Sequence, residues 1–349
     1  TYTLTRSSAA SDVYKRQAVN VLRESSLGMI VTNGDPDGRI DNTLVGADFL
    51  YRNSVFRGDE SLTGRLWFQR SFSSDRSGDE FAWAAGVSYP NDLRFWRLDF
   101  LEIGEGFNPA LGFVNRRDIR RYEGEYRYRI RRPGYVRTID FELLGNLTTD
   151  RSDRPESGLV RVTPLQYENV YGGFVDFRAQ YRFERPTFDF TLPGGLDVSA
   201  GTYHWADGQV ELRGSKNWPL TASLILGGGQ FFDGERVYAT PRVEWRPSEH
   251  FLLDVRYELR QTWLPQESGA THLVVGEIAF FFTPDISWRT LVEYDNVSDS
   301  VGINSRLRWI VEDGREIFVI LNQGAEIIDG EWRRGVTQPF AKIAWTFRF

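Results

Sequence analysis

The feature that most constrains this chain is a strict alternation of apolar and charged residues over long stretches. From Tyr122 to Arg131, aromatic or apolar residues occupy one set of alternate positions and charged residues the other. The same pattern recurs at residues 253–260 and 303–309. Because successive side chains of a β-strand point to opposite faces, each stretch predicts a strand with one apolar and one charged face. The sequence therefore predicts an all-β fold.

Strand and connection lengths distinguish a membrane barrel from a soluble β-sandwich, whose strands also alternate. Strands of about ten residues exceed the ~5–6 usual in soluble sheets and match the ~9–11 that cross a bilayer at a tilt. Tight connections such as 132–134 alternate with longer ones, predicted at residues 73–79, 149–158, 265–269 and 329–338. This alternation is typical of bacterial barrels. For residues 18–349 we therefore predict a transmembrane antiparallel up-and-down β-barrel of 16–18 strands, with short periplasmic turns and longer extracellular loops.

Trp and Tyr gather near the predicted strand ends, where the aromatic girdle of a barrel lies. These residues are Tyr89, Trp96, Tyr257, Trp263, Trp288, Tyr294, Trp309 and Trp345. The last strand carries Ala341, Ile343, Trp345, Phe347 and Phe349 on one face, which resembles the terminal signature by which outer-membrane barrels are recognised for insertion. The pattern predicts the bacterial outer membrane as the location. The expected partners are the lipid bilayer, lipopolysaccharide and the barrel-assembly machinery.

The first residues carry a different signal. Asp12 to Gln17 spell DVYKRQ, which is what GATGTGTATAAGAGACAG encodes, and that DNA resembles a transposase adapter used for sequencing libraries. We therefore predict that residues 1–17 are an unstructured adapter artefact. The natural start, with any signal peptide and an amino-terminal module, is expected to be missing.

Composition argues against several function classes. The chain has no Cys and three His, which disfavours thiolate and imidazole metal sites, and no cofactor is predicted. The net charge of −6 (42 basic minus 48 acidic residues) comes without a concentrated basic patch, so nucleic acid is not an expected partner. His204, His250 and His272 show no motif linking them to a serine or an acid pair, so no catalytic residue is predicted. The acidic stretch at residues 35–41 allows a calcium loop, but a plain turn explains it without a metal.

Two features are candidate functional elements of the barrel interior. The segment from Phe107 to Asp118 is interpreted either as a constriction that folds into the lumen, with Arg116, Arg117 and Asp118 as its charges, or as a packed outer loop. Charged strand positions form a predicted ladder that is either a selectivity surface or a set of mutual ion pairs. Its basic members are Arg127, Arg129, Arg131, Arg256, Arg260, Arg306 and Arg308, and its acidic members are Glu123, Glu125, Asp254, Glu258 and Glu293.

One segment also carries a family resemblance. Residues 106–128 contain Phe-Asn-Pro at 107–109, Gly-Phe-Val at 112–114 and Arg-Arg-Asp at 116–118, ahead of a predicted strand. They resemble the barrel domain of an outer-membrane family of unknown function, which usually follows a family-nine carbohydrate-binding module. The resemblance implies a pore, receptor or anchor linked to carbohydrate binding or uptake, with a glycan as a further partner. Members are also labelled membrane-associated hydrolases, which implies an alternative in which active groups lie in the missing module or the outer loops.

Overall fold

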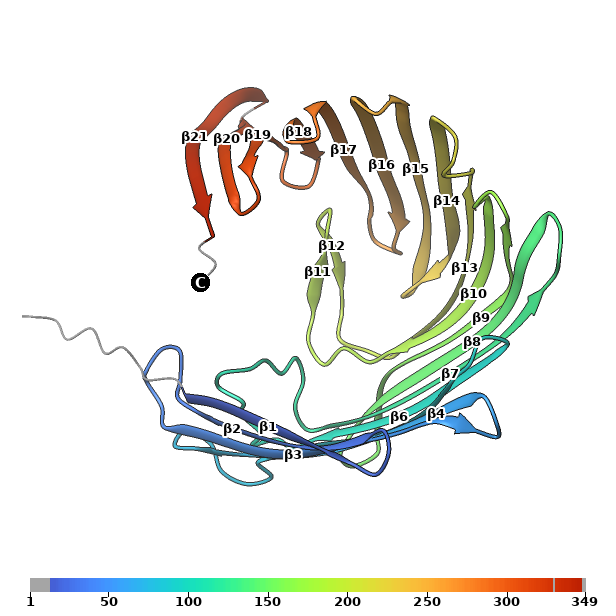
Figure 1. Cartoon of the computed structure of the whole chain (residues 1–349), viewed down its shortest axis with the longest axis vertical. Helices are drawn as coiled ribbons and strands as arrows, with labels where there is room; N and C mark the ends of the chain where they lie inside the picture. Colours follow the sequence, from blue (N-terminus) through green and yellow to red (C-terminus); the bar gives the residue numbers. More distant parts are fainter. Residues whose placement is uncertain (1–12, 329, 347–349) are drawn as a thin grey trace, which may run out of the picture. The chain divides into compact units, whose positions relative to one another are not determined.

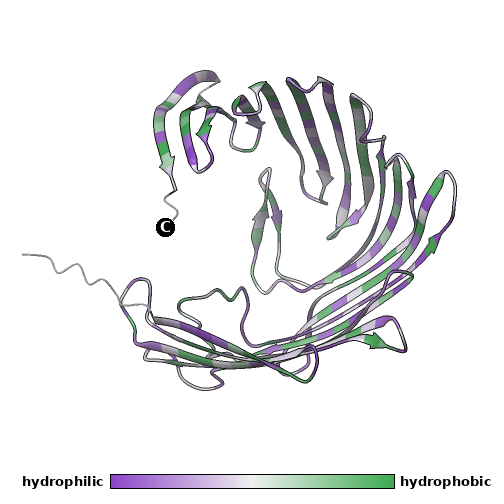
Figure 2. Ribbon diagram, in the orientation of Figure 1, coloured by the Kyte–Doolittle hydropathy of each residue, from purple (hydrophilic) through white to green (hydrophobic). Residues whose placement is uncertain are grey.

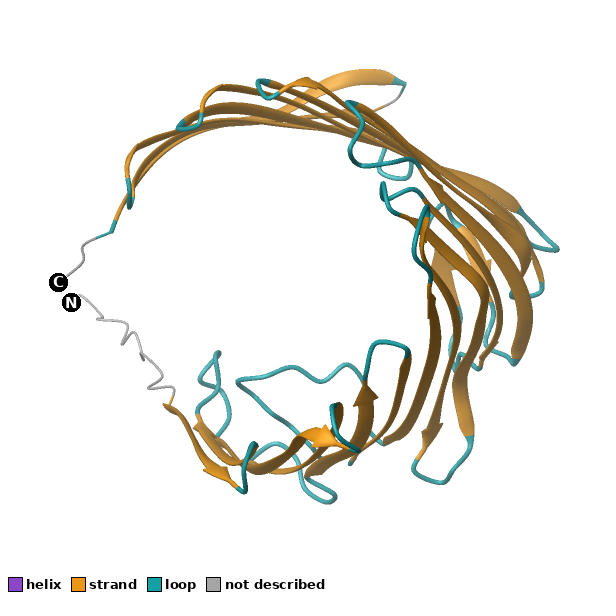
Figure 3. Ribbon diagram, turned by 45° about the vertical axis from the view of Figure 1, so that its right-hand side comes forward, coloured by secondary structure: helices purple, strands orange, loops and turns teal. Residues whose placement is uncertain are grey.

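The computed structural model describes residues 13–328 and 330–346, and in this part of the chain it contains strands and loops but no helix (Figure 3). The strands of the first half are β1 (Val13–Val21), β2 (Ser25–Asn33), β3 (Asn42–Phe56), β4 (Glu60–Ser73), β5 (Phe81–Pro90), β6 (Arg94–Ile103), β7 (Ile119–Arg131), β8 (Val136–Asp150), β9 (Pro155–Asn169) and β10 (Phe174–Glu184). They are followed by β11 (Phe190–Leu192), β12 (Leu196–Val198), β13 (Tyr203–Arg213), β14 (Leu220–Phe231), β15 (Gly234–Ser248), β16 (Phe251–Trp263), β17 (Ser268–Thr283), β18 (Ile286–Asp295), β19 (Ser300–Glu312), β20 (Arg315–Ile328) and β21 (Glu331–Trp345).

The chain divides into two compact units. The first comprises Thr1–Ile130, Asp140–Val162 and Arg182–Arg185, and the second comprises Arg131–Ile139, Thr163–Tyr181 and Pro186–Phe349. Within the first unit, β1 to β7 pair in sequence order, each antiparallel to the next. Within the second unit, β13 to β21 do the same.

The predicted all-β, antiparallel up-and-down fold is confirmed, but the predicted count of 16–18 strands is too low. Among the described residues, nineteen strands belong to one sheet, and β11 and β12 form a separate two-stranded ribbon. Two prolines lie in β9, where Pro155 is the first residue and Pro164 lies within the strand. A proline removes only its own backbone donor, so a strand can continue where the remaining donors are paired.

The predicted unstructured start is wrong for its last five residues. Val13–Val21 form β1, in which Tyr14 lies opposite Thr32 and Gln17 opposite Met29. Backbone hydrogen bonds make this ladder and require no particular side chains, so an unusual sequence does not prevent pairing. Residues 1–12 lie outside the described residues, and the adapter origin of this stretch stays a prediction.

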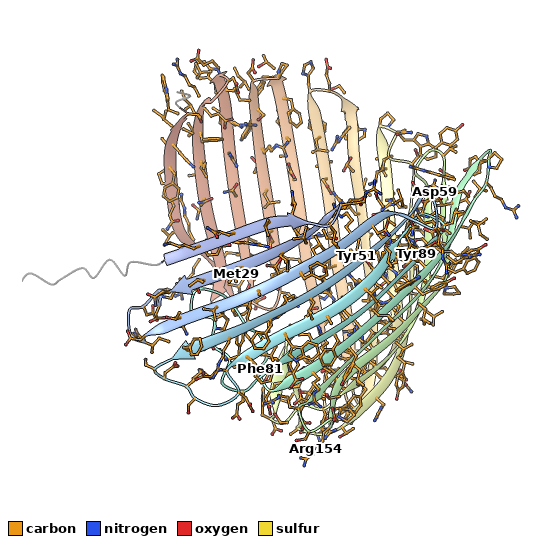
Figure 4. The ribbon with its side chains drawn as sticks, turned by 60° about the horizontal axis from the view of Figure 1, so that its bottom comes forward. Met29, Tyr51, Asp59, Phe81, Tyr89 and Arg154 are labelled. Atoms are coloured by element: carbon orange, nitrogen blue, oxygen red, sulfur yellow. The ribbon has the colours of Figure 1, made fainter. Side chains whose placement is uncertain are left out.

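Hydrophilic and hydrophobic residues alternate along many strands (Figure 2), so each unit has two chemically different faces. In the first unit, the cross-strand row Leu50, Arg65, Gly86, Asp99 and Glu123 identifies the face that we call the charged face. The residues between them in sequence form the apolar face, to which Met29, Tyr51, Phe81 and Tyr89 in Figure 4 belong. In the second unit, the row Glu244, Asp254, Glu277 and Leu291 identifies the charged face, and Trp245, Leu253, Ile278 and Thr290 lie on the apolar face.

Connection lengths follow the predicted asymmetry, with two corrections. The longest connections, residues 34–41, 74–80, 104–118 and 185–202, all follow even-numbered strands. The long loops predicted at 149–158 and 329–338 are wrong, because β8 and β9 extend to Asp150 and from Pro155, and β21 already begins at Glu331. Polar residues in these stretches belong to strand ends, where side chains do not need an apolar surface.

Candidate functional site

The predicted ladder residues of the first unit lie on its charged face, and most contact partners that sequence analysis did not name. Arg129 makes a bidentate contact with Asp140, with its Nε and Nη2 atoms 2.8 and 2.7 Å from the two carboxylate oxygens. The Asp140 side chain is only 4% exposed, so this is the best shielded pair of the ladder. Glu125 pairs with Arg97 at 3.1 Å and Glu123 with Arg121 at 3.6 Å. The Arg127 guanidinium lies over the Phe95 ring, 5.3 Å from its centroid.

The second unit continues the same chemistry on its own charged face. Glu258 lies between Arg256 and Arg260, with N–O distances of 3.3 and 2.8 Å. Asp254 accepts from the Nε of Arg242 at 2.8 Å. The guanidinium of Arg308 contacts Glu316 at 2.6 Å, and that of Arg306 lies 4.4 Å from the centroid of the Phe318 ring. The arrangement places positive and negative side chains next to one another along the charged face, and exposed pairs of this kind contribute only ~0–1 kcal/mol each.

Sequence analysis named only one side of most of these pairs. The missed partners are Arg65, Arg97, Asp99, Asp140, Arg242, Glu277, Arg289 and Glu316. Their position in the alternation was a usable signal, because each shares the charged face with the predicted residues. Their pairing was not predictable, because the register between two strands depends on the turn that joins them.

Two glycines of β14, Gly227 and Gly229, allow side chains of the flanking strands β13 and β15 to contact each other across β14. Gly229 lies between Asp207 on β13 and Arg236 on β15. The Nη2 atom of Arg236 is 3.7 Å from the Oδ2 atom of Asp207. Gly227 likewise lies between Gln209 and Tyr238, whose hydroxyl donates to the Gln209 amide oxygen at 3.2 Å. A Cβ at position 227 would come within 2.2 Å of the Tyr238 ring. The glycine run is therefore explained by close side-chain approach across the strand.

The segment of residues 104–118 folds against the charged face of the first unit. Phe107 is 3% exposed and packs with Leu44 and Ala82, and Val114 contacts the same cluster. Leu44 and Ala82 belong to the charged face, since they share its alternate positions. Asn108 fixes the segment further, because its backbone N–H donates to Ser71 at 2.9 Å and its carbonyl accepts from Asn42 at 2.8 Å. The segment therefore packs on the charged face, and whether it acts as a constriction or as a packed outer loop stays a prediction.

The three charges predicted for this segment have different environments. The Nε of Arg117 donates to the Phe107 carbonyl at 2.6 Å. Burial lowers the pKa of Arg117, and the neighbouring Arg76 guanidinium lowers it further. Arg116 pairs with Glu156 at 2.9 Å, and Asp118, at a positive φ of 59°, lies 3.9 Å from Arg151. Arg117 therefore holds the segment in place, while Phe113 at 86% exposure is its most exposed side chain among the large apolar residues.

A second segment, residues 186–202, folds over the charged face of the second unit and contains the hairpin of β11 and β12 (Figure 1). Its base is held by rings, with Phe190 and Trp205 5.8 and 4.8 Å from the Phe232 centroid. Its tip reaches β17, where the side chain of Leu196 lies beside Gly269 and the N–H of Asp197 donates to Glu267. From β13 to β17 is four strand spacings, or ~19 Å. The hairpin thus covers a wide strip of the charged face.

The apolar face carries aromatic residues in rows at the strand ends. Next to the short connections, Trp245, Phe251, Phe280 and Trp288 form a chain of ring contacts across β15 to β18, with centroid distances of 5.3–5.7 Å. At the other end, Tyr294 lies 6.5 Å from Trp332, whereas Tyr257, in the middle of β16, stacks on His272 at 6.0 Å. Tyr89 and Trp96 stack at 5.9 Å in the first unit. Of the predicted insertion signal, Ala341, Ile343 and Trp345 lie on the apolar side of β21, whereas Phe347 and Phe349 lie outside the described residues.

Metal and histidine chemistry finds little support in the described residues. That part of the chain contains no group of three or more His, Asp or Glu side chains arranged to hold a metal ion. The carboxylate of Asp35 accepts from the backbone N–H of Arg39 at 2.8 Å, as expected of a turn. His204 and His272 contact the hydroxyls of Tyr181 and Tyr257 at 2.7 and 2.6 Å.

Residues 13–328 and 330–346 contain no helix that is long and apolar enough to span a membrane.

Comparisons with known proteins give one structural likeness. No protein-family model matches the chain, and no curated protein matches it. The solved structure of the ferric yersiniabactin uptake receptor FyuA from Yersinia pestis is similar at 11% sequence identity and a TM-score of 0.31, over 95% of this chain and 66% of that chain. This chain therefore spans less than two thirds of the length of that receptor.

Proposed function

We propose that the chain forms an outer-membrane β-barrel that acts as a pore or receptor for small hydrophilic solutes, with a lumen narrowed by residues 104–118 and 186–202. The observation that carries the proposal is the two-faced sheet. Exposed aliphatic and aromatic side chains such as Leu66, Val255 and Leu307 cover one face, and ion pairs cover the other. In a soluble protein an apolar face of this extent would be covered by another layer.

Strand dimensions support a bilayer as the covering layer. Strands β5, β6 and β18 have ten residues each, or ~33 Å of extended chain. At the ~40° tilt usual in barrels, this length spans the ~25 Å apolar band of an outer membrane. The ring rows at the strand ends would then lie at the two interfaces. Closure of the sheet follows from the same physics, because an open edge in hydrocarbon leaves backbone groups unpaired at a cost of several kcal/mol each.

The two segments on the charged faces support a restricted lumen. The charged faces would line the water-filled interior, and a segment packed on such a face reduces the cross-section available to solutes. Phe113 would face this space, since it is exposed on a segment whose Phe107 is buried in the wall. An exposed ring beside a charged wall can contact the apolar side of a passing solute.

Planar-bilayer conductance tests the proposal. The refolded chain should migrate differently with and without heating in detergent electrophoresis and should form channels. Replacing residues 189–199 by a short Gly-Ser linker should raise the single-channel conductance, because the hairpin would no longer cross the charged face. Val297→Ser, in an exposed turn away from the hairpin, is the matched control and should leave conductance unchanged. A chain that stays soluble and monomeric without detergent would contradict the proposal.

The carbohydrate link is the more specific part of the proposal. It is supported by the resemblance of residues 107–118 to the outer-membrane family named above, and the structure gives those residues a defined role in anchoring a segment. We propose short glycans as the solutes, with lipopolysaccharide and the barrel-assembly machinery as further partners. Concentration-dependent block of the channel current by linear oligosaccharides, reduced in Phe113→Ala, would support the glycan link. The absence of block by any tested glycan would count against it.

A further inference from the structure

An apolar groove of about 700 Å³ crosses the apolar face of the first unit. Its walls include Trp96, Leu98, Tyr122, Tyr126, Leu143 and Leu147. Gly124 and Gly145 form its floor, and Gly124 lies directly opposite Leu98 on β6. The rest of this face is covered by large side chains, but the two glycines have none. The depth of the groove is therefore about the length of one side chain.

Nothing in the described chain fills the space above the two glycines. A Cβ built at Gly145 would meet only the Leu159 carbonyl oxygen, at 3.9 Å, and one at Gly124 would meet only the Leu98 Cδ2, at 3.4 Å. Both are ordinary van der Waals distances. Neither glycine has the positive φ that would require glycine for backbone reasons. The missing side chains therefore leave room without a packing or conformational need within the chain.

The groove lies in the middle of the strands, and a polar cluster lies on the same face beyond one end of it. Glu102 and Arg120 lie opposite each other on β6 and β7, at the same alternate positions as Leu98 and Gly124. The Glu102 carboxylate contacts both Arg120, at 3.4 Å, and Arg151, at 3.1 Å. Arg120 is four residues from Gly124, or ~13 Å along an extended strand. A ligand lying along β7 would thus meet hydrogen-bonding groups at one end and only hydrocarbon beyond it.

We propose that this groove seats an acyl chain of a membrane lipid whose polar headgroup lies at the Glu102 and Arg120 rim. The proposal rests on the membrane location proposed above. In hydrocarbon, attraction between the lipid and the wall comes from close packing, because the surrounding lipid is equally apolar. A flexible chain can fill a groove one residue wide, whereas a second copy of this face would have to place a side chain there. Water has no partners in the groove and is a poor occupant.

Photo-crosslinking tests the proposal. The full chain is reconstituted in phosphatidylethanolamine vesicles that contain a phospholipid with a diazirine in the middle of one acyl chain, and labelled peptides are quantified by mass spectrometry. Residues 122–160 should be labelled more strongly than residues 253–282, which also present an apolar face. Gly145→Leu fills the groove and should reduce labelling of residues 122–160 about fivefold. Gly276→Leu is the matched control, since Gly276 lies on an apolar face opposite Val255 and a Cβ there meets nothing within 4 Å.

Each outcome decides the proposal. Selective loss of label in Gly145→Leu, with Gly276→Leu unchanged, supports it. Equal labelling of wild type and Gly145→Leu, or crosslinks between two copies of residues 122–160, would overturn it while leaving the membrane location intact. If residues 253–282 are unlabelled as well as residues 122–160, the chain does not insert into the bilayer. That result overturns the proposed function together with this proposal. If Gly145→Leu does not fold, as judged by heat modifiability, Gly145→Ala replaces it and should give a smaller reduction in the same peptides.

Discussion

Removing the Asp140 carboxylate, the partner of Arg129, should destabilise the protein more than removing any acidic member of the predicted ladder. The Asp140 side chain is 4% exposed and holds the Arg129 guanidinium through two hydrogen bonds. Asp140→Ala would leave a guanidinium that is only 21% exposed with a weaker partner, Asp92, at 3.2 Å. Breaking a shielded pair from one side costs ~3–5 kcal/mol, because the remaining charge stays poorly solvated.

Asp92→Ala is the matched control, since it removes the exposed partner of the same arginine. The Asp92 side chain is 47% exposed, and a pair of this kind contributes only ~0–1 kcal/mol. The assay is reversible urea unfolding in lipid vesicles, followed by tryptophan fluorescence. With an m-value of ~3 kcal/mol/M, a loss of ~3 kcal/mol moves the unfolding midpoint down by ~1 M. Equal midpoint shifts for Asp140→Ala and Asp92→Ala would refute the argument from burial.

Three further predictions address the faces, the segment on the charged face and the glycines. Val255→Arg, on the apolar face, should lower the free energy of unfolding in vesicles by ~2–4 kcal/mol. Val275→Arg on the neighbouring strand should lower it far less, because Val275 lies opposite Glu293 on the charged face. Equal losses for the two variants would contradict the assignment of the faces. Phe107→Ala should cost ~3–5 kcal/mol and expose residues 104–118 to limited proteolysis, whereas Phe113→Ala should stay within ~0.5 kcal/mol because that ring is 86% exposed. Gly229→Ala should lower the free energy of unfolding by ~1–3 kcal/mol in the same assay, because the φ of Gly229 is 147° and the Ala206 carbonyl oxygen would lie 2.7 Å from the new Cβ. An unchanged free energy of unfolding would show that the backbone relaxes there.

Sequence alone predicted the faces of the sheet well, because alternation is a local property. Glu123, Arg127 and Asp254 occupy the charged positions of the alternation in the sequence, and the structure places all three on charged faces. Pairing between strands is not local. The contact of Arg242 with Asp254 depends on the turn at residues 249–250 and on a register shift between Trp245 and Ser248, neither of which alternation records.

The candidate site was less predictable for a related reason. An irregular segment has no period, so the sequence of residues 104–118 does not say which face Phe107 contacts, and two interpretations stayed open. The strands β11 and β12 of the hairpin have only three residues each, too few for an alternation to be recognised. Its anchor, Glu267, is seventy residues further along the chain than Asp197, so no local pattern connects them.

The alternation of side chains between the two faces of each strand also determines where insertions and deletions can be tolerated during evolution. One residue inserted into β16 would move Val255 to the side of Arg256 and would reverse every side chain after it. The connections at residues 104–118 and 185–202 carry no register, so they can lengthen, shorten or be exchanged while the wall keeps its pairing. Relatives should therefore differ in length and sequence mainly in these two segments, while their strands keep the same lengths and pairing.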